Sequence, residues 1–197
     1  MESQKPLWNK LYKSRLDWKK ETLNLPNLLK SKIVLELGVG TGKTLKSILK
    51  QKPKKVLAID FSEEALQICK ENVKDSRVSF VNSDILNFQS GEKFDVIVCY
   101  YVLNNLEENE RKRAVEKMQN LLNKEGIILF EDFAKGDFRE KQERKDNLFC
   151  HFFSESEVKE LFRDFSEIKI KTRTLSLIRT DKKLKRRIIS AIIKRPR

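Results

Sequence analysis

Three glycines at alternate positions, Gly38, Gly40 and Gly42, have the spacing in this chain that most directly suggests chemistry. They lie between an apolar run that ends at Leu37 and a helix-like segment that begins at Thr44. Glycine tolerates backbone conformations that other residues avoid, and it lets the main chain approach a ligand closely. The segment is therefore predicted to be a ligand-binding loop.

The spacing of these glycines distinguishes three kinds of ligand site. A P-loop, G-x-x-x-x-G-K-[ST], needs a glycine where the chain has Leu37, and a dinucleotide fingerprint, G-x-G-x-x-G, needs one where it has Lys43. One residue of slip misplaces the backbone amides that hold phosphates. The chain has E-x-G-x-G-x-G from Glu36 to Gly42, so both of these alternatives fail by a single position.

Acidic residues follow the next two apolar runs. Asp60 comes directly after Val56–Ile59, 24 residues beyond Glu36, and Asp84 follows the third run. The Asp60 carboxylate could accept hydrogen bonds from both hydroxyls of a ribose, and Phe61 could offer a flat apolar face to adenine. A helix-capping role is the alternative for Asp60. Because Asp60 ends a strand, its replacement by alanine is expected to leave the fold intact.

Apolar runs that resemble buried strands alternate with helix-like segments. Strands are predicted at Ile33–Leu37, Val56–Ile59, Val78–Val81, Phe94–Cys99 and Ile127–Phe130, and helices at Thr44–Gln51, Ser62–Asn72, Glu108–Leu122 and Ser154–Phe162. Continuous apolar strands between helices are typical of a parallel sheet covered on both faces. Residues 167–180 look like a final strand pair. The prediction is an α/β fold with a mostly parallel seven-stranded sheet, helices on both faces and a terminal antiparallel strand pair.

Taken in order over residues 33–133, these features resemble the class I, Rossmann-like S-adenosylmethionine-dependent methyltransferases. The glycine loop is similar to the first motif of that family, and residues 94–106 look like its fourth strand and the following loop. The resemblance implies S-adenosylmethionine as the cofactor, with Glu36 near its methionine amino group, Asp60 on its ribose and Asp84 on its adenine. The other contacts implied by the resemblance or by position come from Gly38, Val39, Gly40, Thr41, Gly42, Phe61, Ile85, Cys99 and Tyr100.

The N-terminal segment carries aromatic side chains at roughly helical spacing over residues 7–20. Tyr12 and Trp18, together with Trp8, could cover the cofactor as a lid, and simple packing against the core is the alternative. The predicted organisation is an N-terminal helical lid over residues 1–30, a methyltransferase core over 31–181 and a basic amphipathic tail over 182–197.

No sequence motif identifies the catalytic residues of this chain. Methyl transfer is an in-line displacement that depends on alignment and exclusion of water, and it needs a general base only when the nucleophile carries a proton. The candidates are Asn105, Asp132 and His151, which is the one histidine in the sequence. The loop over residues 100–105 lacks the [DN]-P-P-[YF] sequence associated with methylation of adenine and glutamine amino groups, which argues against those acceptors.

The formal net charge of +13 is unevenly distributed. Residues 182–197 contain eight basic residues and no acidic one. A helix there would place Leu184 and four isoleucines on one face. The tail is therefore predicted either to dock on the body through this face or to contact a polyanion, RNA or an acidic protein. An anionic membrane surface is the third alternative.

Composition limits the remaining classes. Three widely separated cysteines and a single histidine argue against a zinc cluster and a disulfide framework, so no metal is predicted. No apolar run reaches the ~18 residues of a transmembrane helix, and the N-terminus lacks a secretory pattern. We expect a cytoplasmic protein without a transmembrane segment.

Together these features predict an enzyme that transfers a methyl group from S-adenosylmethionine to an unidentified acceptor. The basic tail slightly favours a macromolecule, either RNA or protein, as that acceptor. A small metabolite as the acceptor, and a non-catalytic protein that only binds S-adenosylmethionine, stay open as alternatives.

Overall fold

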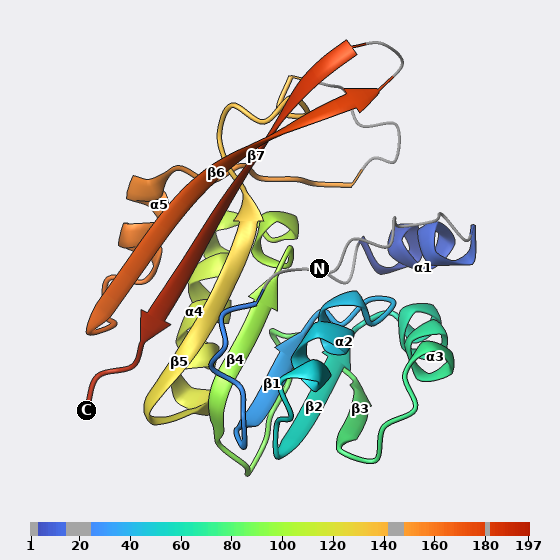
Figure 1. Ribbon diagram of the computed structural model, residues 1–197, viewed down its shortest axis with the longest axis vertical. Helices are drawn as coiled ribbons and strands as arrows, with labels where there is room; N and C mark the ends of the chain where they lie inside the picture. The colour runs from blue at the N-terminus through green and yellow to red at the C-terminus, as the bar shows by residue number, and fades with distance from the viewer. Residues whose placement is uncertain (1–3, 15–24, 142–147, 180–181) are drawn as a thin grey trace.

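A single seven-stranded sheet organises the chain in the computed structural model, which describes residues 4–14, 25–141, 148–179 and 182–197 (Figure 1). The sheet order is β3-β2-β1-β4-β5-β7-β6, with parallel pairing from β3 to β5 and antiparallel pairing of β7 with both β5 and β6. The strands are β1 (Ile33–Leu37), β2 (Lys55–Asp60), β3 (Val78–Asn82), β4 (Phe94–Tyr100), β5 (Leu122–Phe133), β6 (Glu167–Arg179) and β7 (Lys182–Lys194).

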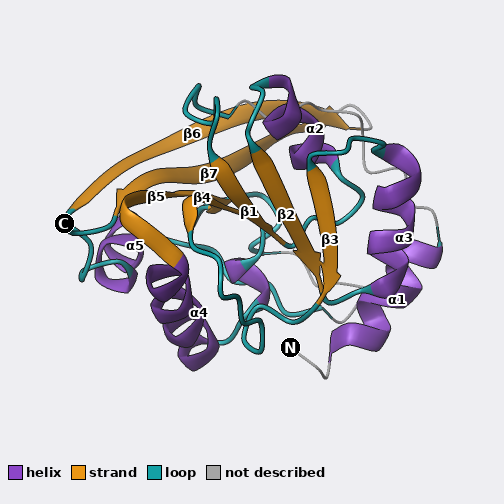
Figure 2. Cartoon of the chain, turned by 90° about the horizontal axis from the view of Figure 1, so that it is seen from below, coloured by secondary structure: helices purple, strands orange, loops and turns teal. Residues whose placement is uncertain are grey.

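Helices cover both faces of this sheet (Figure 2). They are α1 (Lys5–Lys13), α2 (Lys43–Lys50), α3 (Glu63–Asn72), α4 (Glu108–Leu121) and α5 (Glu155–Leu161), with a 3₁₀ turn η2 (Leu103–Asn105). The larger part of the core joins α4 and α5 to one face of the sheet, and a second cluster joins α2 and α3 to the other face. The predicted α/β fold class is therefore confirmed.

Helices α3 and α5 begin where the sequence provides capping side chains. The Ser62 side chain accepts a hydrogen bond of 3.2 Å from the backbone N–H of Ala65 at the start of α3, as predicted. Ser154 and Glu157 form a capping box at the start of α5, in which each side chain accepts a hydrogen bond from the other residue's backbone N–H. These local signals explain why the predicted starts of α3 and α5 lie within one residue of the observed ones.

The C-terminal residues correct the sequence prediction. Residues 182–194 form β7, an interior strand between β5 and β6, and not an amphipathic helix. Residues 167–179 form only one strand, β6, whose partner is β7 rather than a second strand within the same segment. Isoleucine is branched at Cβ and favours strands, and the alternation of Ile189, Ala191 and Ile193 toward the α4–α5 core has the period of a strand. The spacing of the isoleucines fits both periods, so the pattern was ambiguous.

Among the described residues, no helix is long and apolar enough to span a lipid bilayer.

We predict that Ile189→Ala lowers the free energy of unfolding by about 2–5 kcal/mol, because this fully buried side chain lies in the core between β7 and the helices. Urea denaturation measures the change. Lys185→Ala, at an exposed position of the same strand, is the control and is expected to stay within about 0.5 kcal/mol of wild type. Equal, small effects of both substitutions would mean that β7 is not part of the folded core.

Candidate active site

The glycine loop joins the end of β1 to the start of α2 and is shaped by left-handed backbone conformations. Gly40 has φ of +53° and Gly42 has φ of +84°. A Cβ at Gly42 would lie 2.8 Å from Cys69 Sγ in α3, and a Cβ at Gly40 would lie 3.2 Å from Tyr12 Oη in α1. Gly42 thus permits close packing on α3, whereas Gly40 keeps the loop backbone accessible on the side that faces α1.

Asp60 connects this loop to the end of β2 and the start of α3. Its Oδ2 accepts a hydrogen bond of 2.8 Å from the Gly40 backbone N–H, and its Oδ1 accepts one of 2.9 Å from the Ser62 backbone N–H. Burial raises the pKa of Asp60 to about 6, although these backbone hydrogen bonds act to lower it. Each carboxylate oxygen retains a lone pair for a further donor. Because two backbone groups depend on it, we now expect Asp60→Ala to destabilise the fold, contrary to the sequence prediction.

Glu36 lies on β1, opposite Ala58 of the neighbouring parallel strand β2 that ends at Asp60, and is only 2% exposed. Its Oε2 atom has no hydrogen-bond partner among the described residues. Burial, with a further contribution from Asp60, raises the pKa of Glu36 well above its usual value. A buried acceptor without a donor is costly unless a ligand supplies one. A cationic amino group fits this position, so the residues of the site suit the methionine part of S-adenosylmethionine.

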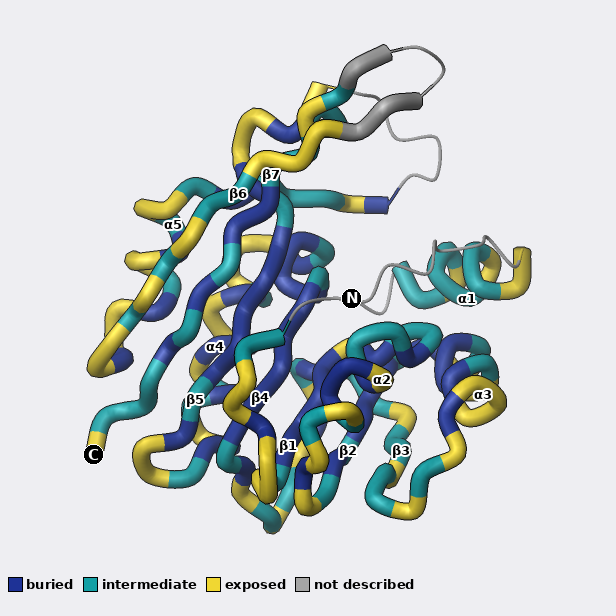
Figure 3. The backbone as a smooth tube through the Cα atoms, in the orientation of Figure 1, coloured by how far each residue is buried: buried dark blue, intermediate teal, exposed yellow. Residues whose placement is uncertain are grey.

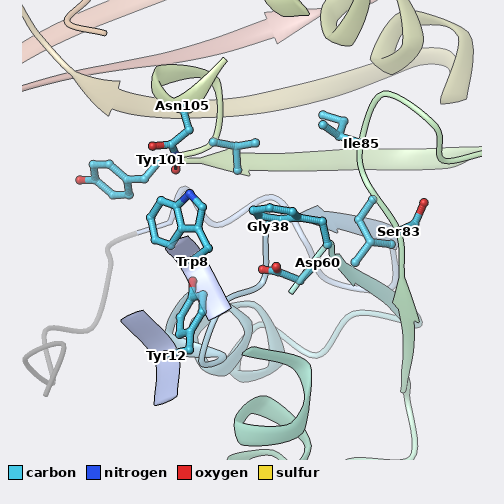
Figure 4. A pocket seen from close by; sticks show the side chains of 11 residues that line it. Trp8, Tyr12, Gly38, Asp60, Ser83, Ile85, Tyr101 and Asn105 are labelled. Carbon is cyan, nitrogen blue, oxygen red and sulfur yellow. Dashed lines mark hydrogen bonds between the residues drawn. The ribbon is translucent and has the colours of Figure 1, made fainter. Parts of the chain in front are cut away.

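A cleft lies over the carboxyl ends of the parallel strands, the usual ligand-binding edge of an open α/β sheet (Figure 4). Five of the residues that the sequence predicts to bind the cofactor line it, and so does one catalytic candidate. These six are Tyr12, Gly38, Asp60, Phe61, Ile85 and Asn105. The cleft is completed by Trp8, Ile59, Ser83, Tyr101 and Val102.

Tyr101 and Val102 were not singled out from the sequence, because no motif marks them. The one local sign of Tyr101 is structural, a φ of +58° that is rare for a non-glycine residue. Its hydroxyl donates a 2.7 Å hydrogen bond to Glu131 Oε1 in β5. Side chains that follow β4 are brought to the cleft by the sheet order, which places β4 directly beside β1.

Other predicted cofactor residues lie outside the lining of this cleft. Cys99 is fully buried in the core on the α4–α5 side, and Tyr100 lies on the opposite face of β4. The Asp84 side chain accepts a hydrogen bond from the Leu86 backbone N–H, and Val39 is buried in the α2–α3 cluster. Thr41 lies in the loop and uses its carbonyl oxygen to accept a hydrogen bond from Asn72. Trp18 falls outside the described residues.

The three catalytic candidates are separated by the fold. Asn105 lines the cleft, where its Oδ1 is buried without a partner among the described residues. Asp132 is fully buried away from it and accepts hydrogen bonds from the backbone N–H groups of Asn104 and Phe133. His151 Nε2 lies 3.3 Å from Glu157, and burial lowers the histidine pKa. Asp132 and His151 therefore hold loops together rather than face the cleft.

The helix α1 packs against α3 and covers the cleft, with Trp8 and Tyr12 pointing into it (Figure 4). Asn9 Oδ1 accepts a 2.6 Å hydrogen bond from the Ser62 hydroxyl, and the Lys13 ammonium lies 3.1 Å from the Glu64 carboxylate. The space left beneath α1 is about 60 Å³, enough for about two water molecules. A nucleoside-sized ligand therefore requires α1 or its aromatic side chains to shift.

Comparison with known proteins agrees with this arrangement. A family model described as a methyltransferase domain matches residues 34–126. Among solved structures, the chain is similar to the N-methyltransferase NodS of Bradyrhizobium japonicum in complex with S-adenosyl-L-homocysteine, with TM-score 0.67 and 19% identity over 98% of this chain and 89% of that one. It is also similar to an S-adenosylmethionine-dependent methyltransferase of Anabaena variabilis, with TM-score 0.72 and 16% identity over 98% and 94% of the two chains.

Residues 34–126 thus match a methyltransferase domain, and the fold of the chain is that of class I, Rossmann-like S-adenosylmethionine-dependent methyltransferases. Among curated relatives, it is 28% identical over 132 residues to a tRNA N(3)-methylcytidine methyltransferase of Schizosaccharomyces pombe, covering 62% of this chain and 43% of the relative. It is 33% identical over 124 residues to an uncharacterized methyltransferase of Anoxybacillus flavithermus, covering 62% and 57%. The chain spans about half the length of these relatives.

We predict that affinity for S-adenosylhomocysteine falls as the pH is lowered through about 6, by up to about tenfold per pH unit. Only the ionised Asp60 can accept from both ribose hydroxyls while also holding its two backbone donors. The effect on stability has the opposite sign, because a carboxyl whose pKa is raised by folding is less destabilising once protonated. Calorimetry between pH 5 and 8 measures the affinity. The control variant Asp60→Asn should bind S-adenosylhomocysteine about 1.5–3 kcal/mol more weakly at neutral pH, and its affinity should depend less on pH. If the affinities of wild type and variant change with pH in parallel, Asp60 does not contact the ligand.

Proposed function

We propose that the chain catalyses methyl transfer from S-adenosylmethionine to a nucleophilic atom of a macromolecule, with RNA as the favoured class of acceptor. The observation that carries the proposal is the pair of buried carboxylates, Glu36 and Asp60, at the end of adjacent strands beside the glycine loop. Two neighbouring buried acids are unfavourable unless donors or a cation compensate them. A ligand with both an amino group and a ribose supplies these groups.

The residues around the cleft would hold the cofactor by distinct parts. Glu36 takes the methionine amino group, Asp60 the ribose hydroxyls, and Phe61 and Ile85 the two faces of the adenine. When bound, S-adenosylmethionine supplies a methyl group on a sulfonium centre that a nucleophile can displace. Trp8 and Tyr12 on α1 would close over it and exclude water.

On the acceptor side, Asn105 is the residue that we assign to positioning the nucleophile. Its Nδ2 donates a 3.1 Å hydrogen bond to the Tyr101 carbonyl oxygen, which fixes the amide plane. Its Oδ1 is then directed elsewhere and is available to accept a hydrogen bond from an acceptor N–H or O–H. Alignment of this kind accounts for catalysis without a strong general base in the cleft.

The class of acceptor is inferred from charge and from one relative. The net charge of +13 favours a polyanionic partner, and eight of the basic residues lie in the last sixteen, most of which form β7. The Schizosaccharomyces pombe relative is named for methylation of tRNA, which supports RNA over protein here. A cytoplasmic location stays a prediction from the sequence.

We predict that the protein binds S-adenosylmethionine and S-adenosylhomocysteine with micromolar dissociation constants, which correspond to a binding free energy of about −8 kcal/mol. The buried carboxylates and the loop backbone provide the specific contacts. Titration calorimetry with ATP and NAD as control ligands tests this assignment. Heat with either control, and none with S-adenosylhomocysteine, would contradict it.

We expect label from methyl-labelled S-adenosylmethionine to enter the RNA fraction of a cell lysate incubated with the protein. Asn105→Ala should lower kcat at least about tenfold while cofactor affinity changes little, because the residue contacts the acceptor side only. Label in the protein fraction or in small molecules would show that those molecules, and not RNA, are the acceptors. If the protein binds the cofactor but no fraction is labelled, the protein is a non-catalytic binding protein.

A further inference from the structure

The sheet has one face beyond β4 that no helix covers among the described residues. In β5, β7 and β6 directly opposed residues form rows across the strands, such as Leu129, Ile192 and Lys169. Opposed residues point to the same side of a sheet. The alternate residues of β7, such as Ile189 and Ile193, point to the α4–α5 core. The first set of rows therefore forms a separate face, and Figure 3 shows that the described residues of β6 are exposed or intermediate, with Lys169 and Lys171 exposed.

A groove runs along this free face. One wall is formed by Leu25 and Pro26, in the segment that crosses β4 and β5 on its way to β1 (Figure 1). The other wall is β6, and the floor includes Leu129 of β5 and Ile192 of β7. The groove encloses about 450 Å³. It has an apolar floor and one strongly polar wall.

The polar wall is basic and regularly spaced. Lys169, Lys171 and Arg173 alternate along β6, so successive charges are about 6.6 Å apart along the strand. The Lys171 ammonium has no carboxylate within ion-pair distance among the described residues, whereas Lys169 pairs with Glu167 at 2.8 Å. Glu131, the other acid on this face, is buried and already receives hydrogen bonds from Arg173 and Tyr101. The wall therefore presents an excess of positive charge to the groove.

A chain of hydrogen bonds connects the groove to the cleft. Arg173 and Tyr101 donate to the two carboxylate oxygens of Glu131, at 2.8 and 2.7 Å, and Tyr101 also lines the cleft. Beyond it, the Tyr101 ring lies 4.9 Å from that of Phe133, and the guanidinium of Arg186 lies 5.8 Å from the Phe133 ring. The Nε of Arg186 is buried without a partner among the described residues. Aromatic rings beside cations are suited to stacking bases next to phosphates.

We propose that this groove, defined by Leu25, Pro26 and the β6 residues 169–173, binds single-stranded RNA and directs an acceptor base into the cleft beside Tyr101. The proposal rests on the proposed methyltransferase function and adds where the acceptor lies. A row of cations at even spacing matches the repeated phosphates of one extended strand, and the apolar floor and aromatic end match unstacked bases. An acidic polypeptide would use the cations but not the apolar floor.

The test measures binding of a fluorescein-labelled oligouridine to the full chain by anisotropy at two salt concentrations. The groove variant is Lys169→Ala with Lys171→Ala. The matched control is Lys124→Ala with Lys159→Ala, which removes the same charge from exposed positions of β5 and α5. We expect the groove variant to bind at least about fivefold more weakly, with the slope of log Kd against log salt reduced by about 1.4, and the control to change less than twofold.

Equal effects of the two variants would overturn the groove as the binding site. Stronger displacement of the oligouridine by polyglutamate than by unlabelled RNA would also overturn it, in favour of an acidic protein partner. Melting temperatures check that both variants fold, and S-adenosylhomocysteine calorimetry keeps the two proposals separate. A groove variant that binds cofactor and methylates RNA like wild type refutes the groove alone. If the wild-type protein does not bind S-adenosylhomocysteine, the methyltransferase proposal is refuted, whatever the groove binds.

Discussion

The buried Asp60 carboxylate is the interaction on which the site depends. It joins three parts of the chain that are distant in sequence or direction, because one oxygen accepts from Gly40 in the glycine loop and the other from Ser62 at the start of α3. The loop can reach Asp60 only because β1 and β2 are adjacent and parallel. An ionised carboxylate is costly to bury. A ligand that donates hydrogen bonds to Asp60 reduces this cost, so the site favours such a ligand.

Acidic and basic side chains are separated between the cleft and the groove. The cleft is lined by Asp60, with the buried Glu36 nearby but outside its lining, whereas the groove on the free sheet face is lined by Lys169, Lys171 and Arg173. The cleft thus suits a ligand with a cationic end, and the groove suits an anionic one. Glu131 lies between them and is neutralised by Arg173, so the change of sign occurs within one short hydrogen-bonded chain.

The position of α1 means that this helix or its aromatic side chains must move before a nucleoside-sized ligand can enter the cleft. Its aromatic side chains occupy much of the cleft, and its contacts with the body include the Asn9–Ser62 hydrogen bond and a partly exposed ion pair of Lys13 with Glu64. Exposed ion pairs contribute little to stability, so the Lys13–Glu64 pair adds little to the attachment of α1. The helix shares Ser62 with Asp60 as a hydrogen-bond partner, which links the position of α1 to the end of β2.

The sequence by itself determined the five parallel strands, the helix starts and the glycine loop, because apolar periodicity, capping residues such as Ser62 and glycine spacing are local signals. It also placed Asp60 and Asn105, which follow strands whose carboxyl ends meet at one edge. Only the tertiary structure decided the role of residues 182–194, since their isoleucines fit both a helix and a strand until β5 and β6 offer hydrogen-bonding edges. It likewise decided that His151 lies away from the cleft, because pairing with Glu157 depends on contacts that no local pattern encodes.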